Sequence, residues 1–406
     1  MIRRRIAALA AGVGAAALVL TACGGGSSAS SGGDIEVGAY APLTGSLASP
    51  GTILTNGMKL KFDQVNAAGG INGRKVKLTV LDDTGNAATA VTVANQLAGN
   101  KNTVAVLGSY GSSIGMPASA ALEKAQVPNV QSQLSTPDAV NRGFKYLFNT
   151  YPLGEDVEKQ TFLRAIEQKM ITPQRVSLVY IDSPFATAAA KVITDQAAAH
   201  GYTVVSNEKI QPQQASYAST VTKIKGDNPD TVWLAVNGAE AKTLLTNMQQ
   251  LGFKPTNLYG EGNPLIDPTA MASVGTLNDG VLVGTQWWPG SPTQANQTFL
   301  SDYKAAYGGE APPQMAPGGY QAAEILVAAL RSIPADTISR ETVRDALAKL
   351  QNVPTVYGPV SFAPNGQLQF QALYLLQNQA GTPVVVLPTA EAKPGTKVQG
   401  YLAGAS

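Results

Sequence analysis

The sequence has very little of the chemistry that many enzymes and metal proteins use. Its 406 residues include one cysteine and one histidine, which excludes an intrachain disulfide and a cysteine-based metal cluster. Charged residues make up only 14% of the chain, and the formal net charge is +2. Nucleic-acid binding therefore has no electrostatic support, and we expect no metal and no cofactor.

The N-terminus carries a pattern typical of secretion. Three arginines at positions 3 to 5 precede an uncharged apolar run over positions 6 to 20, as in a signal peptide, so we expect residues 1–22 to be removed. Loss of these arginines leaves 26 basic against 27 acidic side chains, a net charge of −1. No later apolar run is long enough to span a membrane.

The signal pattern ends in Leu20-Thr21-Ala22-Cys23, which resembles the bacterial lipobox. The resemblance implies that Cys23 is acylated, for example with palmitate, and becomes the first residue of a lipoprotein. Ordinary cleavage nearby with an incidental cysteine, or a short membrane anchor, remain alternatives. Residues 23–33 are rich in glycine and serine and are predicted to form a flexible tether. We therefore expect a body held by lipid at the extracytoplasmic face of the cell membrane.

The stretch from 104 to 138 predicts strand, loop, helix, strand and loop in succession. The apolar β-branched run at 104–107 is followed by Ser112 and Ser113 and an alanine-rich helix, and a second strand at 128–131 is followed by STPD at 135–138. The serines are predicted to cap one helix, and STPD to start another. Hydroxyls and helix N-termini at the carboxyl ends of adjacent parallel strands favour binding of an anion such as a carboxylate.

The same stretch contains G-x-S-x-G at positions 111 to 115, a pattern found in hydrolases whose nucleophile would be Ser113. Such a serine needs a base, and the only histidine, His200, lies at the predicted end of a helix. Loose five-residue patterns also recur by chance among 41 glycines. Helix capping or ligand contact therefore explains Ser113 better than catalysis.

Strand and helix patterns alternate along the chain, which indicates an α/β fold with parallel sheets. Strands are predicted over 35–41, 75–81, 104–107, 128–131, 175–181, 202–209, 231–236, 257–259 and 280–285. Helical patterns lie between them, and a strand pair is predicted around Pro364-Asn365-Gly366.

Four runs carry a specific resemblance. They are IEVGAYAPLTG from residue 35, NAAGGINGRKVKLTVLDD from residue 66, TAVTVANQLAGNKNTVAVLGSYGSS from residue 89, and STPDAVNRGFKYLFNT from residue 135. In order and spacing the chain resembles the leucine/isoleucine/valine-binding protein family, type I periplasmic substrate-binding proteins of ABC importers. The resemblance covers the body from Asp34 to about Thr389.

The resemblance implies two Rossmann-like lobes with parallel sheets, joined by a three-segment hinge. Residues 34–153 and 286–357 would form the first lobe, and residues 154–285 and 358–400 the second. The chain would cross between them near Tyr151, Gln286 and Tyr357.

The resemblance also implies a ligand site in the cleft. Ser112 and Ser135 would hold a carboxylate from the first lobe, with backbone around Gln133 beside them, and Glu261 would hold an ammonium from the second. Helix capping for the serines, and a solvated loop position for Glu261, are the alternatives.

Several positions depart from the family's pattern. Phe185 stands where relatives usually carry tyrosine, Pro50 and Asn237 replace residues that are often aromatic, and Gln133 replaces a small one. Trp287 and its neighbour Trp288 would either roof the cleft or pack at the lobe junction. Tyr110 and Tyr151 are further candidates, with core or hinge packing as the alternative. Extra rings would favour a hydrophobic or aromatic ligand.

We therefore expect a monomeric binding protein, and no enzyme. It would capture a branched-chain, hydrophobic or aromatic amino acid by hinge closure and deliver it to a membrane permease with its ATPase. A sensor of amides or amino acids with the same fold, a secreted serine hydrolase using Ser113, and a purely structural lipoprotein are the alternatives.

Overall fold

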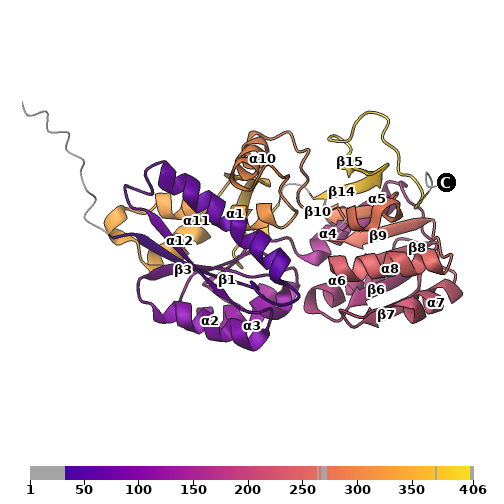
Figure 1. The fold of residues 1–406 in the computed structure, drawn as a ribbon, viewed down its shortest axis with the longest axis horizontal. Helices are drawn as coiled ribbons and strands as arrows, with labels where there is room; N and C mark the ends of the chain where they lie inside the picture. Colours follow the sequence, from indigo (N-terminus) through magenta and orange to yellow (C-terminus); the bar gives the residue numbers. More distant parts are fainter. Residues whose placement is uncertain (1–32, 263–264, 267–271, 371–372, 403–406) are drawn as a thin grey trace, which may run out of the picture.

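The computed structural model describes residues 33–262, 265–266, 272–370 and 373–402, and it contains two lobes, each built around its own β-sheet (Figure 1). The predictions for the signal peptide and Cys23 lie outside the described residues. Within the described ranges, no helix combines the length and the apolar character that crossing a bilayer requires.

The first lobe is centred on a five-stranded sheet with the order β2-β1-β3-β4-β5, in which all neighbours are parallel. Its strands are β1 (Ile35–Ala41), β2 (Val76–Asp82), β3 (Thr103–Gly108), β4 (Asn129–Gln131) and β5 (Leu147–Asn149). The helices between them are α1 (Ala48–Ala67), α2 (Ala87–Gly99) and α3 (Ser112–Lys124). The strands predicted in this region are confirmed to within one or two residues at their ends.

Helices cover both faces of the first sheet. α2 and α3 form a core with one face, and α1 packs on the other together with residues that return late in the chain. The returning helices are α10 (Gln294–Ala306), α11 (Ala316–Arg331) and α12 (Arg340–Ala348), with the short 3₁₀ turn η3 (Ala335–Thr337). α11 lies directly against α1, because glycines remove side chains at the contact: a Cβ on Gly319 would lie 1.9 Å from the Leu54 carbonyl oxygen.

The second lobe is centred on a seven-stranded sheet with the order β15-β14-β10-β9-β8-β6-β7. Its strands are β6 (Arg175–Ile181), β7 (Thr203–Ile210), β8 (Thr231–Ala235), β9 (Asn257–Glu261), β10 (Leu282–Thr285), β14 (Tyr374–Gln379) and β15 (Thr382–Leu387). Its helical segments are α4 (Gly154–Gln160), α5 (Phe162–Glu167), α6 (Pro184–Asp195), α7 (Ala218–Gly226), α8 (Gly238–Gln250) and η2 (Gly275–Asn278). Strands β6 to β10 are parallel, and β14 and β15 add an antiparallel edge.

The third crossing between the lobes falls later than the sequence indicates. The segment after α12 forms a small antiparallel sheet of β11 (Val353–Thr355), β12 (Gly358–Phe362) and β13 (Leu368–Gln369). Val360, Phe362 and Leu368 are buried in the core of the first lobe. Residues 358–369, which were predicted for the second lobe, therefore pack on the first, because their apolar side chains have their partners there.

Two predicted helix starts also differ from the structure. α3 begins after Gly111, whose φ of +90° suits glycine, so Ser112 and Ser113 are the first helical residues instead of caps. The segment at 135–138 starts no α-helix, only the single 3₁₀ turn η1 (Pro137–Ala139). Ala139 and Val140 of this segment are buried in a small core, and the chain turns at Gly143, whose φ is +72°.

Candidate functional site

The carboxyl ends of strands from both sheets meet at a small cavity of about 80 Å³. In parallel α/β sheets this edge is the usual place for a ligand. The lining residues from the first lobe are Tyr110, Gly111, Ser112, Gln133, Ser135, Tyr151 and Met315, and those from the second are Phe185, Val236, Asn237, Glu261 and Gly262. The structure therefore brings together six of the seven predicted ligand-binding residues. Their contact with a ligand stays a prediction.

The first-lobe wall of this cavity offers neutral hydrogen-bond donors. The Ser135 backbone N–H donates to the Ser112 hydroxyl oxygen at 3.2 Å, so the two loops after β3 and β4 hold each other in place. The Ser112 hydroxyl is left with its own proton to donate. The buried Gln133 side-chain nitrogen has no hydrogen-bond partner among the described residues. This wall therefore has spare donors suited to an anion.

The second-lobe wall carries one buried acid. Glu261 ends β9 with 4% of its surface exposed, and its Oε2 atom has no hydrogen-bond partner in the described part of the chain. Burial raises the pKa of the Glu261 carboxyl from its usual 4.5 to about 8. A cation placed beside it would restore the ionised form, because an opposite charge lowers the pKa of a buried acid.

A backbone contact joins the two walls next to this acid. The Gly154 N–H, at the start of α4, donates to the Ser135 carbonyl oxygen at 2.7 Å. A Cβ on Gly154 would lie 3.6 Å from Glu261 Oε1 and 3.5 Å from that carbonyl oxygen. Gly154 therefore lies beside both Glu261 and the first-lobe loop.

A second acid lies behind Glu261. Glu158 on α4 is fully buried, and its oxygens lie near the Trp233 indole and the Tyr259 hydroxyl without reaching hydrogen-bonding geometry. Burial, and then the charge of Glu261, hold the pKa of Glu158 well above its usual range. Both causes favour the protonated, uncharged form of Glu158.

The two predicted residues at neighbouring loops face the same cavity. Phe185 follows β6 at the start of α6 and is half-buried against the core of the second lobe. Asn237 follows β8 and is the N-cap residue of α8, but its side chain makes no capping hydrogen bond. Its amide is therefore available to the cavity. The ring of Phe185 supplies an apolar or cation-facing surface.

Trp287 is not among the lining residues. Its side chain is 2% exposed and packs against Phe299, and its indole N–H donates to the Asn296 side-chain oxygen at 2.7 Å. Trp288 packs against the core of the second lobe. The sequence left two uses open for these two rings. Their contacts match packing at the lobe junction.

The serine in the G-x-S-x-G pattern has no base beside it. Ser113 is exposed on α3 of the first lobe, whereas His200 follows the far end of α6 in the second. The ten helical rises from Phe185 to the end of α6 at Asp195 span roughly 15 Å at 1.5 Å per residue, and His200 lies five residues further along the chain. The histidine ring instead contacts the Gln196 carbonyl oxygen and Glu167. This geometry does not support a Ser-His nucleophile.

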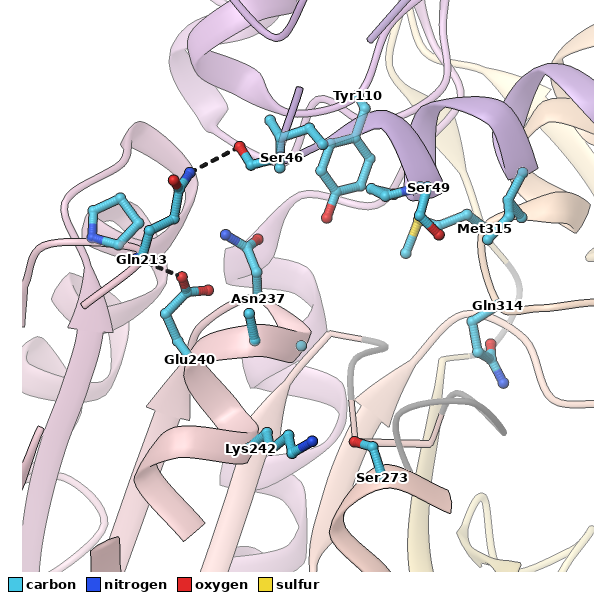
Figure 2. A pocket seen from close by; sticks show the side chains of 16 residues that line it. Ser46, Ser49, Tyr110, Gln213, Asn237, Glu240, Lys242, Ser273, Gln314 and Met315 are labelled. Carbon is cyan, nitrogen blue, oxygen red and sulfur yellow. Dashed lines mark hydrogen bonds between the residues drawn. The ribbon is translucent and has the colours of Figure 1, made fainter. Parts of the chain in front are cut away.

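A larger chamber of about 400 Å³ adjoins the cavity and shares Tyr110, Asn237 and Met315 with it (Figure 2). Its remaining lining residues are Ser46, Leu47, Ser49, Pro50, Ile53 and Gln314 from the first lobe, and Pro212, Gln213, Gly238, Ala239, Glu240, Lys242 and Ser273 from the second. The chamber and the cavity together form one interlobe cleft. Their combined size lies within the range of about 300–1,000 Å³ that is usual for small-molecule pockets.

Sequence reasoning missed several of these residues. Glu240 and Lys242 lie in the first turns of α8, directly after β8, so the rule that strand ends converge could have found them. Met315 lies in a segment without a chemical signal, and only the return of the chain to the first lobe places it in the cleft. Gln213 comes from the loop after β7, whose place beside Ser46 depends on how the lobes meet.

The arrangement suits a small zwitterion better than a reacting substrate. Neutral donors on one wall face a buried acceptor on the other, which matches a carboxylate and an ammonium on one carbon. Among the described residues, the acidic and histidine side chains form no cluster that could hold a metal ion.

Comparison with known proteins agrees with this geometry. Residues 34–383 match the model of the family described as periplasmic binding protein. The Leu/Ile/Val-binding protein homolog 8 of Brucella abortus (strain 2308) is 29% identical over 371 residues, which cover 87% of this chain and 91% of that protein.

Two solved structures share the fold. One is the branched-chain amino acid transporter substrate-binding protein LivJ of Streptococcus pneumoniae in complex with isoleucine, with a TM-score of 0.76, 21% identity and coverage of 86% of this chain and 97% of that one. The other is an ABC transporter solute-binding protein of R. palustris in complex with benzoate, with a TM-score of 0.78, 20% identity and coverage of 87% and 96%. The same fold thus occurs with ligands of different chemistry.

Proposed function

The chain belongs to the periplasmic binding protein family, and from this membership and the chemistry of its cleft we propose that it captures an α-amino acid between its lobes for an ABC importer. The observation that carries the proposal is the pairing across the cavity. Glu261 Oε2, a buried acceptor without a partner in the described chain, faces a wall with spare donors from Ser112 and Gln133. The protein does no chemistry on this ligand.

The ligand would bind with its carboxylate on the first lobe and its ammonium at Glu261. Because each end binds a different lobe, the bound molecule would favour the closed arrangement of the two lobes. The crossings after β5, after β10 and between β13 and β14 would act as the hinge. An apolar side chain would pass Phe185 and Met315. Relatives are named for leucine, isoleucine and valine, which supports an amino acid ligand of this kind.

The proposed setting is the outer face of the cell membrane. Removal of residues 1–22 and acylation of Cys23 would leave a monomeric body on a short tether, close to a permease and its ATPase. Replacement of Cys23 by alanine should release the protein from membranes into the soluble fraction. Wild-type protein from a bacterium with lipoprotein processing should carry acyl mass on its N-terminal peptide, and its absence would overturn the anchor.

A ligand screen tests the proposed function. Purified, ligand-stripped protein should gain thermal stability with leucine, isoleucine, valine or phenylalanine, because a ligand at a hundredfold over its Kd stabilises by about 2.7 kcal/mol. Benzoate, which lacks the ammonium, and isobutylamine, which lacks the carboxylate, are matched controls that should give a much smaller shift. Equal shifts with these controls would contradict the two-ended recognition.

A further inference from the structure

The outer chamber is too large to be explained by a leucine-sized ligand. The inner cavity, at about 80 Å³, has room for the charged head group, and the chamber beyond Tyr110, Asn237 and Met315 adds about 400 Å³. A ligand that stopped at these three residues would leave most of the interlobe cleft filled with water. Burial of most of a ligand's surface is usual in such clefts. The chamber therefore points to a longer ligand.

One wall of the chamber is apolar. Leu47, Pro50 and Ile53 from the first lobe lie opposite Ala239 at the start of α8. These side chains offer contacts to methylene groups and no hydrogen bonds. The part of the ligand that enters the chamber from the inner cavity is therefore an aliphatic stem.

The polar wall is built around a buried carboxylate. Glu240 is 2% exposed, and its Oε1 atom accepts the backbone N–H of Gln213 at 2.8 Å, while its Oε2 atom has no hydrogen-bond partner among the described residues. The charge of Glu240 also reaches the neighbouring Tyr110, whose pKa rises to about 12 mainly because the ring hydroxyl is buried. A buried acceptor oxygen without a partner is unfavourable, and an N–H or O–H donor of a ligand would satisfy it.

The chamber also has a cationic group and a closing contact (Figure 2). The Lys242 side chain points into the chamber from α8, below Glu240, and is exposed to solvent. The Gln213 side-chain nitrogen donates to the Ser46 hydroxyl at 2.8 Å, which ties the second lobe to the first at the rim. The distal end of the ligand thus meets a buried acceptor and an exposed donor, a combination that suits a neutral amide or ureido group.

We propose that the ligand is an α-amino acid whose long side chain has an aliphatic stem and a distal amide or ureido group, with its N–H donated to Glu240 and its carbonyl oxygen directed to Lys242. This inference rests on the proposed function, because the head group is placed by Glu261 and the first-lobe donors. It differs from that function in the identity of the side chain.

Calorimetry with L-citrulline, L-norleucine and L-leucine tests the inference. Citrulline and norleucine both carry an unbranched aliphatic stem, but only citrulline has the ureido end. Wild-type, ligand-stripped protein should bind citrulline about tenfold or more tightly than norleucine, which corresponds to one hydrogen bond to a charged group. Norleucine binding as tightly as citrulline would overturn the inference.

Two variants locate the effect. Glu240→Gln keeps the size and an oxygen for the Gln213 N–H, but replaces the free acceptor by a donor, so the preference for citrulline over norleucine should fall to about twofold or less. Ala239→Phe, at an exposed position on the chamber wall, should fill the chamber. The affinity for citrulline should then fall by at least tenfold more than the affinity for leucine. A preference retained in both variants would show that the end group lies elsewhere.

The outcomes also separate this inference from the proposed function. If leucine binds and citrulline has no advantage, only the assignment of the chamber fails. If none of the three amino acids binds, the proposed function fails and the inference fails with it.

Discussion

The two walls of the cleft hold their polar groups in opposite ways. On the first-lobe wall, Ser112 is already engaged by the Ser135 N–H and still has a proton to donate, so its donors are oriented before a ligand arrives. On the second-lobe wall, Glu261 is buried with an oxygen that lacks a partner in the described chain. The first wall therefore presents spare donors, from Ser112 and Gln133, and the second wall presents a spare acceptor.

This difference determines what each wall contributes to binding. Neutral donors are independent of pH over the physiological range, and losing one of several costs little. The buried carboxyl has a pKa of about 8, so near neutral pH it is mostly protonated until a cation arrives. The second-lobe wall therefore controls both the affinity for an ammonium and its pH dependence. The predictions below test this asymmetry.

The largest effect is expected for Glu261→Ala. Without the carboxylate, the ligand's ammonium would be buried without a counter-ion, and affinity for leucine should fall by on the order of 2–5 kcal/mol. Calorimetry at pH 8 measures this loss of affinity. Glu167→Ala, which removes an exposed acid of the same lobe outside the cavity, is the matched control and should bind like wild type. Wild-type affinity in Glu261→Ala would contradict the role of the second wall.

Affinity should also rise with pH. Below the pKa of about 8, binding of an ammonium requires the Glu261 carboxyl to release a proton, so each pH unit from 6 to 8 increases affinity up to about tenfold. Above pH 8 the affinity should level off. Titrations in buffers of different ionisation enthalpy would count the released proton. A flat profile, or the same slope in Glu261→Gln, would refute this assignment.

The ligand-free protein should show the opposite trend in stability. The folded-state pKa of Glu261 is raised from 4.5 to about 8, so the folded state holds a proton that the unfolded state has lost. The free energy of unfolding should therefore decrease between pH 4.5 and 8, by at most about 1.4 kcal/mol per pH unit from this group. Urea denaturation of wild type and Glu261→Gln at several pH values measures the difference. The variant should have the shallower slope.

A smaller effect is expected on the first-lobe wall. Ser135→Ala removes one hydroxyl among several donors and leaves the backbone N–H that holds Ser112, so leucine affinity should fall by about 1 kcal/mol. The loss should be the same at pH 6 and pH 8, in contrast to Glu261. A loss as large as that of Glu261→Ala would abolish the difference between the walls.

The smallest effect is expected for Ser113→Ala. This serine is exposed and has no histidine beside it, so ligand affinity and the free energy of unfolding should change by less than about 0.5 kcal/mol. A serine-hydrolase probe should not label the wild-type protein. Stoichiometric labelling of Ser113, lost in His200→Ala, would contradict the binding role of the cleft.

Local signals were sufficient for most of the strands and for the loops at their carboxyl ends. β1 and β6 were predicted with their observed bounds, because period-two or continuous apolar runs bounded by turn residues leave few alternatives. The positions of Ser112, Ser135 and Glu261 followed from the family's motifs. Helix starts were less certain, since Gly111 could replace a side-chain cap and one 3₁₀ turn could replace a helix.

Long-range packing explains the remaining differences between the sequence predictions and the structure. Phe362 and Leu368 lie in a strand pair that the sequence predicted, but only the core of the first lobe decides which lobe this pair joins. The residues next to Trp287 in the sequence do not distinguish a ring that lines the cleft from a ring that packs on Phe299. Its hydrogen bond to Asn296, nine residues away in the chain, is a property of the folded lobe.

The sequence by itself determined the α/β alternation, the family and the hydroxyl-rich loops, because these depend on residues close together in the chain. The tertiary structure alone decided that Glu261 is buried opposite Gln133 and that Glu240 has a free oxygen beside an apolar chamber. Glu261 and Gln133 are 128 positions apart in the sequence, and Glu240 accepts a hydrogen bond from Gln213, which is 27 positions away. The pKa of Glu261, and with it the proposed selectivity of the cleft, follows from that three-dimensional proximity.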